Sequence, residues 1–215
     1  MRCCPVVIFV LITSLPALAV VDLSPEEIQK AYWDSYNYEK MQNYEDAIKA
    51  LMPVYEAYPN GYTVNLRLGW LYYLQGHYAN ALHHYERAMK VLPASIEAKL
   101  GYTLPLLKQQ KYREVEQMCY QILKVDFYNY YGNLRLVYVL RLLGDLQSAE
   151  NVALKMLSLY PTDVAFLTEY GLIKQAQGEL QEAKRIFTDV LTLDPQNITA
   201  KTQLKALQEQ SGKEE

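Results

Sequence analysis

Prolines recur at a fixed interval along this chain. Successive prolines stand 34 residues apart, and Phe127 fills the single rung of this ladder that lacks a proline. The prolines of the ladder are Pro25, Pro59, Pro93, Pro161 and Pro195. A fixed period of this length is typical of arrays in which one small structural unit stacks on the next. We therefore expect one elongated array rather than a compact domain.

The ladder divides the chain into five units, residues 28–61, 62–95, 96–129, 130–163 and 164–197. Each unit has room for two helices of about 13 residues. The fifteenth position marks the turn between them, and glycine there can end a helix in the left-handed conformation. Three units have that glycine: Gly76, Gly144 and Gly178. Gln42 and Gln110 take its place in units one and three, so those turns should form less readily.

Both ends of the array carry helix signals. Residues 20–27 form a lead and first cap, in which Ser24, Pro25 and Glu27 have the order of a capping box with proline at the first helical position. Asn197 predicts the cap of a helix over residues 198–210. The apolar face of that helix should cover the last unit, as terminal caps require: Ile198, Ala200, Leu204 and Leu207. We expect residues 211–215 to be a flexible tail.

The first 19 residues have the layout of a secretory signal peptide. Arg2 precedes an apolar stretch, and Ala17-Leu18-Ala19 supplies the small residues of a cleavage site. The alternative is an uncleaved membrane anchor, since 5–21 reaches the lower limit of about 17 residues needed to span a bilayer. We expect an exported protein, periplasmic or secreted, or one anchored to the membrane if the leader is retained. Cleavage would leave Cys119 as the single cysteine.

Residues 62–95 carry the clearest copy of the repeat. Their large, small and turn residues are Leu68, Gly69, Tyr72, Gly76, Tyr78, Ala81, Tyr85, Ala88 and Pro93. This unit resembles the tetratricopeptide repeat (TPR) family. The resemblance implies an all-α fold, a right-handed α-solenoid of antiparallel helix pairs forming a TPR superhelix, with a C-terminal capping helix. We expect Gly69 to approach Ala81, and Gly171 to approach Ala183. A large side chain at Gly69 should cost about 1–3 kcal/mol.

Unit three departs most from this pattern. Thr103, Val115 and Phe127 replace its small, small and proline residues, while Gly101 and Pro105 interrupt its first helix. Proline within a helix kinks or breaks it. Residues 96–129 therefore form either a distorted repeat or a hinge between two halves of the array.

The sequence offers few residues for chemistry. His77, His83 and His84 are the only histidines, and we expect them to be exposed rather than to bind a metal. Cys119 falls at a packing position, so a buried inert thiol is expected. With a net charge of −3, the chain lacks the basic stripe that nucleic-acid binding requires. We predict a protein that is not an enzyme, with no cofactor, no metal and no evident small-molecule substrate.

The resemblance implies that ligands contact the inner face of the first helices. Aromatic residues and arginines are the side chains that most often anchor interfaces. The predicted partner-binding groove consists of Trp33, Tyr36, Arg67, Trp70, Tyr73, Tyr131, Arg135, Tyr138 and Arg141. The alternative is that these side chains pack neighbouring first helices together. Family members that grip a C-terminal carboxylate have lysine at the fifth position, where this chain has none, so that mode is disfavoured.

Two functions remain open at this point. The first is a non-catalytic scaffold or adaptor in the cell envelope that binds a peptide or helix of a protein partner in the groove. The second is a structural or assembly component of an envelope or secretion complex, which acts through its outer face or by self-association. A retained leader would favour the second function.

Overall fold

The computed structural model describes residues 23–211, and within that range the chain folds into eleven α-helices. The helices are α1 (Pro25–Lys40), α2 (Tyr44–Ala57), α3 (Tyr62–Gln75), α4 (Tyr78–Val91), α5 (Ile96–Lys108), α6 (Tyr112–Val125), α7 (Tyr130–Leu142), α8 (Leu146–Leu157), α9 (Val164–Ala176), α10 (Leu180–Leu193) and α11 (Ile198–Ser211). Consecutive helices pack as pairs, which confirms the predicted all-α repeat fold.

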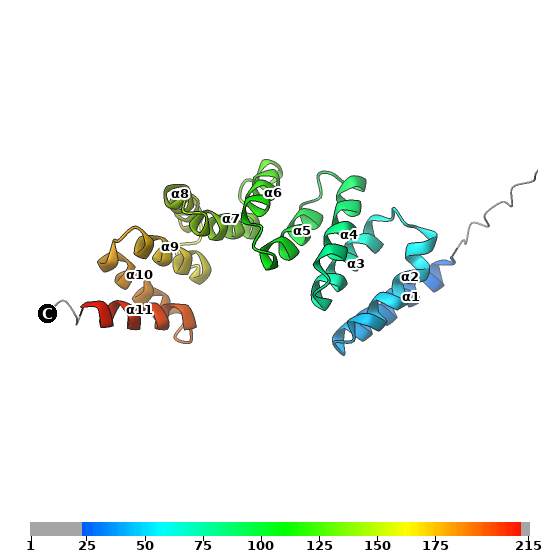
Figure 1. Cartoon of the computed structure of the whole chain (residues 1–215), viewed down its shortest axis with the longest axis horizontal. Coiled ribbons are helices and arrows are strands. Elements are labelled where there is room, and N and C mark those ends of the chain that lie inside the picture. Colours follow the sequence, from blue (N-terminus) through cyan, green and yellow to red (C-terminus); the bar gives the residue numbers. More distant parts are fainter. Residues whose placement is uncertain (1–22, 212–215) are drawn as a thin grey trace, which may run out of the picture.

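The helix pairs follow an arc (Figure 1). In this view α6 and α8 lie on the outside of the arc and α7 lies nearer its inside. First helices of successive units also touch, since α3 packs against α5 and α7 packs against α9. The array therefore has an inner face built from first helices and an outer face built from second helices.

The turn at the fifteenth position is left-handed in all five units. Glycine adopts φ of 84°, 81° and 83° in units two, four and five, as the sequence predicts. Gln42 and Gln110 adopt φ of 58° and 57°, a conformation that strains a residue with a side chain. The fold therefore imposes the same turn on units that lack the glycine.

The predicted caps form at both ends of the array. Ser24 and Glu27 complete the capping box of α1, which starts at Pro25 and so begins before unit one. The Asn197 side chain accepts a hydrogen bond from the Ala200 backbone at the start of α11. Ala200 and Leu207 are buried against the last unit, whereas Ile198 is exposed, so the prediction that Ile198 joins the covering face is wrong. Ile198 is the first helical residue and lies beyond the edge of that face.

The atoms nearest to the glycines at the eighth position belong to aromatic rings. A Cβ atom placed on Gly69 would lie 3.0 Å from ring carbons of Tyr85, and one placed on Gly171 would lie 2.6 Å from the Phe187 ring. Both rings occupy the twenty-fourth position, so each glycine makes room for an aromatic ring. Side-chain sizes at the eighth and twenty-fourth positions are complementary. In unit four, the larger Val137 holds the eighth position and the smaller Ala153 holds the twenty-fourth, and both are buried.

Unit three has a continuous first helix. Helix α5 runs through Pro105, which is buried. A Cβ atom on Gly101 would lie 2.2 Å from Cε1 of Tyr85, so this glycine admits the ring of the preceding unit. The Tyr85 ring thus fits between Gly69 and Gly101. Leu106 and Val115 of unit three belong to one apolar cluster with residues of units four and five.

Several expectations fall outside the described residues. The leader over residues 1–19, most of the lead before Ser24 and the tail after Ser211 are among them. Within residues 23–211, no helix combines the length and the apolar character that crossing a bilayer requires.

Candidate partner-binding groove

Three cavities adjoin one another along the first helices. The first has a volume of about 420 Å³ and lies between α1 and α3, with Glu97 of α5 at its edge. The second, about 230 Å³, lies among α3, α5 and α7, and shares Trp70 and Glu97 with the first. The third, about 380 Å³, lies among α5, α7 and α9 and shares Arg135 with the second. Shared walls make these cavities one groove, which we call the inner groove.

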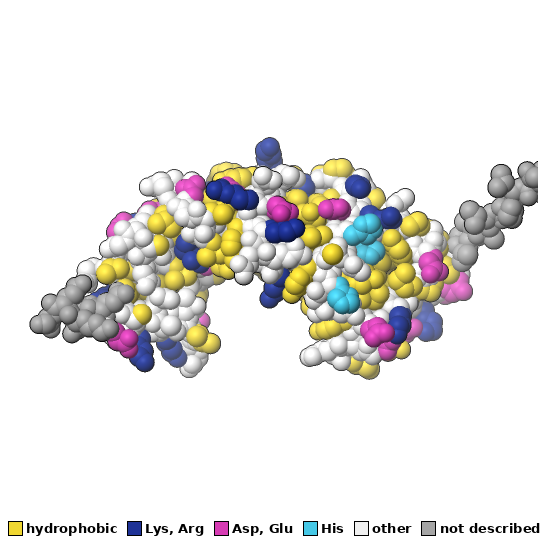
Figure 2. All heavy atoms as spheres, viewed as in Figure 1, with side chains coloured by type: hydrophobic (Ala, Val, Ile, Leu, Met, Phe, Trp, Pro, Cys, Tyr) yellow, Lys and Arg dark blue, Asp and Glu magenta, His cyan; other side chains and the backbone are white. Residues whose placement is uncertain are grey.

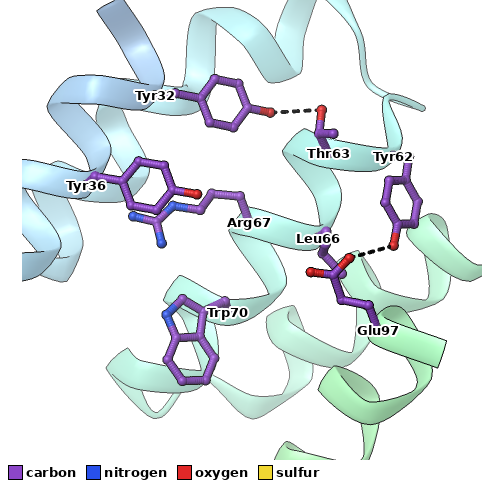
Figure 3. Close-up of a pocket in the computed structure, with 8 residues that line it drawn as sticks. All are labelled: Tyr32, Tyr36, Tyr62, Thr63, Leu66, Arg67, Trp70 and Glu97. Carbon is purple, nitrogen blue, oxygen red and sulfur yellow. Dashed lines mark hydrogen bonds between the residues drawn. The ribbon is translucent and has the colours of Figure 1, made fainter. Parts of the chain in front are cut away.

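Four of the eight residues that line the first cavity are aromatic (Figure 3). Tyr32 and Tyr36 come from α1, and Trp70 faces the same space from α3. The Tyr32 hydroxyl donates a hydrogen bond to Thr63 Oγ1 at 3.1 Å, which ties α1 to α3. The Tyr62 hydroxyl lies 3.2 Å from a carboxylate oxygen of Glu97 and donates to it. These contacts fix the positions of the Tyr32 and Tyr62 rings at the cavity.

Arg67 lies at the centre of this cavity but is almost fully buried, with 7% of its surface exposed. Its guanidinium forms an ion pair with Glu39, donates to Ser35 Oγ at 3.3 Å and lies 3.9 Å above the Tyr36 ring. The other oxygen of Glu39 accepts a hydrogen bond from Trp70 Nε1 at 2.8 Å. Arg67 therefore positions Tyr36 and Trp70, and its charge is already neutralised within the chain.

The middle cavity contains two charges that do not neutralise each other. Arg135 donates to the Leu100 carbonyl and to Thr103 Oγ1, both at 2.5 Å, and has no ion pair among residues 23–211. Partial burial lowers the pKa of its guanidinium, because desolvation disfavours the charged form. Glu97 is exposed at the same cavity and also has no ion pair within that range. A bound segment would meet one cation and one carboxylate here.

The third cavity ends the groove at α9. Tyr138 lines it and remains 37% exposed. Arg141 forms an ion pair with Glu169, with Nε 2.8 Å from the carboxylate, and its guanidinium lies 5.5 Å from the centre of the Tyr138 ring. As at Arg67, an arginine that is paired within the chain supports an aromatic ring.

The structure separates the nine predicted residues into two groups. Five of them line the inner groove: Tyr36, Arg67, Trp70, Arg135 and Tyr138. The other four do not line these three cavities: Trp33, Tyr73, Tyr131 and Arg141. Tyr73 nevertheless stacks near Trp70, with 5.6 Å between ring centres.

Sequence reasoning missed three residues that shape the groove: Glu39, Thr63 and Glu97. Glu39 holds the twelfth position of unit one, and the other two hold the second position of their units. Glu39 lies three residues after Tyr36 and Thr63 lies four residues before Arg67, so helical spacing indicates the same inner face, but the prediction included only aromatic residues and arginines. The packing alternative also has support, because Tyr32 links two first helices.

The histidines differ from their predicted exposure. His77 and His83 are exposed, but His84 is only 7% exposed. Its Nδ1 donates to Asn65 Oδ1 at 2.9 Å, and its ring stacks on the Tyr72 ring. His84 therefore holds a packing position on the inward side of α4, where an apolar residue would be expected.

Burial raises the pKa of the Cys119 thiol to about 12, as expected for an inert cysteine. Among residues 23–211, no group of three or more His, Cys, Asp and Glu side chains could hold a metal.

Comparisons with known proteins agree with this architecture. Residues 63–95 and residues 164–197 each match a model of the tetratricopeptide repeat. A tetratricopeptide repeat protein from Parabacteroides merdae is 17% identical with a TM-score of 0.79, covering 87% of this chain and 75% of its own. MamA from Desulfovibrio magneticus is 16% identical with a TM-score of 0.73, and the match covers 80% of this chain and 98% of the MamA chain.

A third similar structure is YrrB, at 13% identity and a TM-score of 0.69, which covers 84% of this chain and 94% of its own. No curated protein sequence matches the chain. Two of the five helix pairs thus match the repeat in sequence and the whole array matches it in structure, so the chain is a tetratricopeptide repeat protein in fold.

Proposed function

We propose that this chain is an exported adaptor that binds a segment of another protein along the inner groove and carries out no chemistry. The observation that supports this most is the continuity of the three cavities, which offers a segment one path past aromatic rings and two unpaired charges. Peptides and helices bind such grooves through a few anchor side chains. YrrB, described as a TPR protein with an unusual peptide-binding site, has the same fold.

The groove residues divide into contact and positioning roles. Tyr36, Trp70 and Tyr138 present ring faces to the bound segment. Arg135 and Glu97 meet its polar groups, one as a donor and the other as an acceptor. Arg67 holds Tyr36 and Trp70 in place from beneath, so replacing it would weaken binding through the rings.

The export in this proposal is supported by the leader pattern of residues 1–19. Fractionation followed by N-terminal sequencing tests it. A mature chain that starts at Val20 in the soluble fraction is the expected result. A retained leader in the membrane fraction would instead favour an anchored assembly component.

Affinity capture tests the groove. The full chain and two variants, Trp70→Ala and Glu97→Gln, would be used to capture proteins from an extract of the native cells. A partner of the groove should be recovered with the parent protein and lost, by at least about tenfold, with Trp70→Ala. The outer-face variant Leu154→Ser is the control, because Leu154 is exposed on the second helix α8 and lines neither the inner groove nor the pockets between α4, α6 and α8. Capture that is identical for all these proteins would contradict the proposal.

A fluorescence titration measures the same event directly. The chain has two tryptophans, so Trp33→Phe leaves Trp70 as the only one. Binding of the captured partner should change Trp70 emission, because the segment would exclude water from that ring. Thermal unfolding of every variant separates loss of binding from loss of fold.

A further inference from the structure

The outer face contains two equivalent apolar pockets, one repeat apart. The first, about 440 Å³, lies between α4 and α6, with Met89, Pro93 and Met118 among its walls. The second, about 580 Å³, lies between α6 and α8, with Leu123, Phe127 and Val152 at the corresponding positions. Each residue of the second set follows its counterpart by 34 positions. We call this pair of pockets, which α6 separates, the outer cleft.

Phe127 gives the outer cleft its exposed ring. It fills the one rung of the ladder that lacks a proline, and 57% of its surface is exposed. Lys155 Nζ lies 4.0 Å from the centre of the ring and donates to Asn133 Oδ1 at 2.5 Å. The ring therefore contacts a lysine that is itself hydrogen-bonded, and more than half of its surface remains exposed. An exposed aromatic ring beside an apolar pocket is a feature of binding surfaces.

Lysines without ion pairs surround both pockets. Lys90 and Lys99 line the first, and Lys124 and Lys155 line the second. Among residues 23–211, none of these four lysines forms an ion pair. Glu86, the one carboxylate at the cleft, accepts a hydrogen bond from the Tyr102 hydroxyl at 3.0 Å. Figure 2 shows dark-blue side chains next to yellow ones over the outer edge near α6 and α8.

Lys99 is the most informative of the four. Only 7% of its surface is exposed, yet its side chain forms no hydrogen bond or ion pair with another residue of the described chain. The Lys99 ammonium lies at an apolar pocket without an anion beside it, so a carboxylate brought by a ligand would form an ion pair with it. Units two and four have Asn65 and Asn133 at this position, where each is bonded to a backbone carbonyl of the preceding loop.

We propose that the outer cleft binds a second protein partner, through a segment with two apolar anchor side chains and neighbouring carboxylates that lies across α6. The apolar anchors fill the two pockets. The carboxylates pair with Lys99 in the first pocket and with Lys124 in the second. The inner groove plays no part in this interaction, so the array would join two partners, one on each face.

Two variants remove the proposed contacts while keeping the fold. Lys99→Met keeps the apolar stem and removes the charge. Phe127→Pro restores the ladder residue, and the backbone accepts it because Asp126 has ψ of 96°, close to the 82° and 87° of Leu92 and Asp194, which precede prolines. Trp70→Ala in the inner groove and Lys205→Met in the capping helix are matched controls.

The test uses a displayed library of random peptides. Peptides would be selected on the full chain after those that bind the Lys99→Met, Phe127→Pro double variant are removed. The recovered peptides should be rich in Asp and Glu next to Leu, Met or Phe. Each single variant should weaken them by at least about tenfold, and the controls should leave them unchanged. Their binding should also weaken as salt rises.

Four outcomes would overturn the proposal. The first is that no peptide distinguishes the parent protein from the double variant. The second is recovery of peptides without acidic residues. The third is binding of phosphatidylglycerol vesicles that depends on Lys99 and Phe127, which would assign the cleft to an anionic lipid surface. The fourth is self-association of the parent protein that Phe127→Pro abolishes, measured by light scattering, which would assign the cleft to a second copy.

Discussion

Gln42 and Gln110 hold turn positions that glycine holds in the other three units. Their positive φ values cost energy, because the left-handed conformation brings Cβ close to the following carbonyl oxygen. We predict that Gln42→Gly and Gln110→Gly each raise the free energy of unfolding by about 0.5–1 kcal/mol, after the entropy that glycine adds to the unfolded chain is counted. Urea unfolding measures this. Gly76→Gln, the reverse change, should lower the free energy of unfolding by a similar amount. If all three variants were as stable as the parent protein, the prediction would be wrong.

His84 makes the stability of the array depend on pH. Burial, followed by the nearby charges of His83 and Arg87, lowers the pKa of His84 to about 4, below the value near 6.5 of an unfolded histidine. The stability that neutral His84 contributes is therefore complete above about pH 6.5 and is lost as the pH falls toward 4. The loss should reach about 2 kcal/mol near pH 5.

The neighbouring histidine provides the control for this prediction. His84→Gln keeps a partner for Asn65 and removes the titration, so its stability should fall less than that of the parent protein between about pH 8 and pH 5. His83→Gln changes an exposed ring and should behave like the parent protein. If His84→Gln and the parent protein lose the same stability, His84 is not the group responsible.

At the scale of helices, the Tyr85 ring connects units two and three. Gly101→Ala would bring Cβ within 2.2 Å of Tyr85 Cε1, closer than any stable contact, whereas Gly69→Ala would bring it to 3.0 Å. We predict a loss of about 1–3 kcal/mol for Gly101→Ala, despite the better helix propensity of alanine, and a smaller loss for Gly69→Ala. In a Tyr85→Leu background, both losses should shrink. Additive effects of Gly101→Ala and Tyr85→Leu would show that the two positions are not coupled.

Unit three should open together with the units that follow it. Its residues Leu106, Val115 and Cys119 share an apolar cluster with units four and five, while units one and two contribute to a separate cluster. We therefore predict that amide hydrogen exchange in α5 and α6 is as slow as in α7 and α8. Faster exchange across Ile96–Lys124 would support the alternative of a hinge within unit three.

The sequence predicts the helices of this array well, because the ladder and the turn residues act locally. It predicts packing partners less well. The close contact between Gly69 and the Tyr85 ring depends on how one helix rotates against the other, and the spacing of residues does not specify that rotation. His84 was misjudged for the same reason, since the polar character of histidine gave no sign of its place between Tyr55 and Tyr72.

For the molecule as a whole, five of the nine predicted groove residues line the inner groove, but the sequence did not indicate which of them hold other side chains in place. The spacing of Arg67 and Trp70 indicates a shared helix face, but only the packing of α1 against α3 brings Glu39 to both of them. The buried Arg67, paired with Glu39, thus holds in place the aromatic side chains that line the groove. The outer cleft was not predicted, because its pockets form only when second helices of adjacent units lie side by side.

The fit of Tyr85 between Gly69 and Gly101 also fixes the order of the units. If unit four were moved into the place of unit two, Ala153 would stand where Tyr85 stands and would leave a void beneath Gly101. Each unit is thus shaped for the neighbour it has, although all share one backbone plan. We therefore expect that fragments made by cleaving the chain between α4 and α5 reassociate only when unit two contacts unit three. The side chains of each unit thus specify its position in the array.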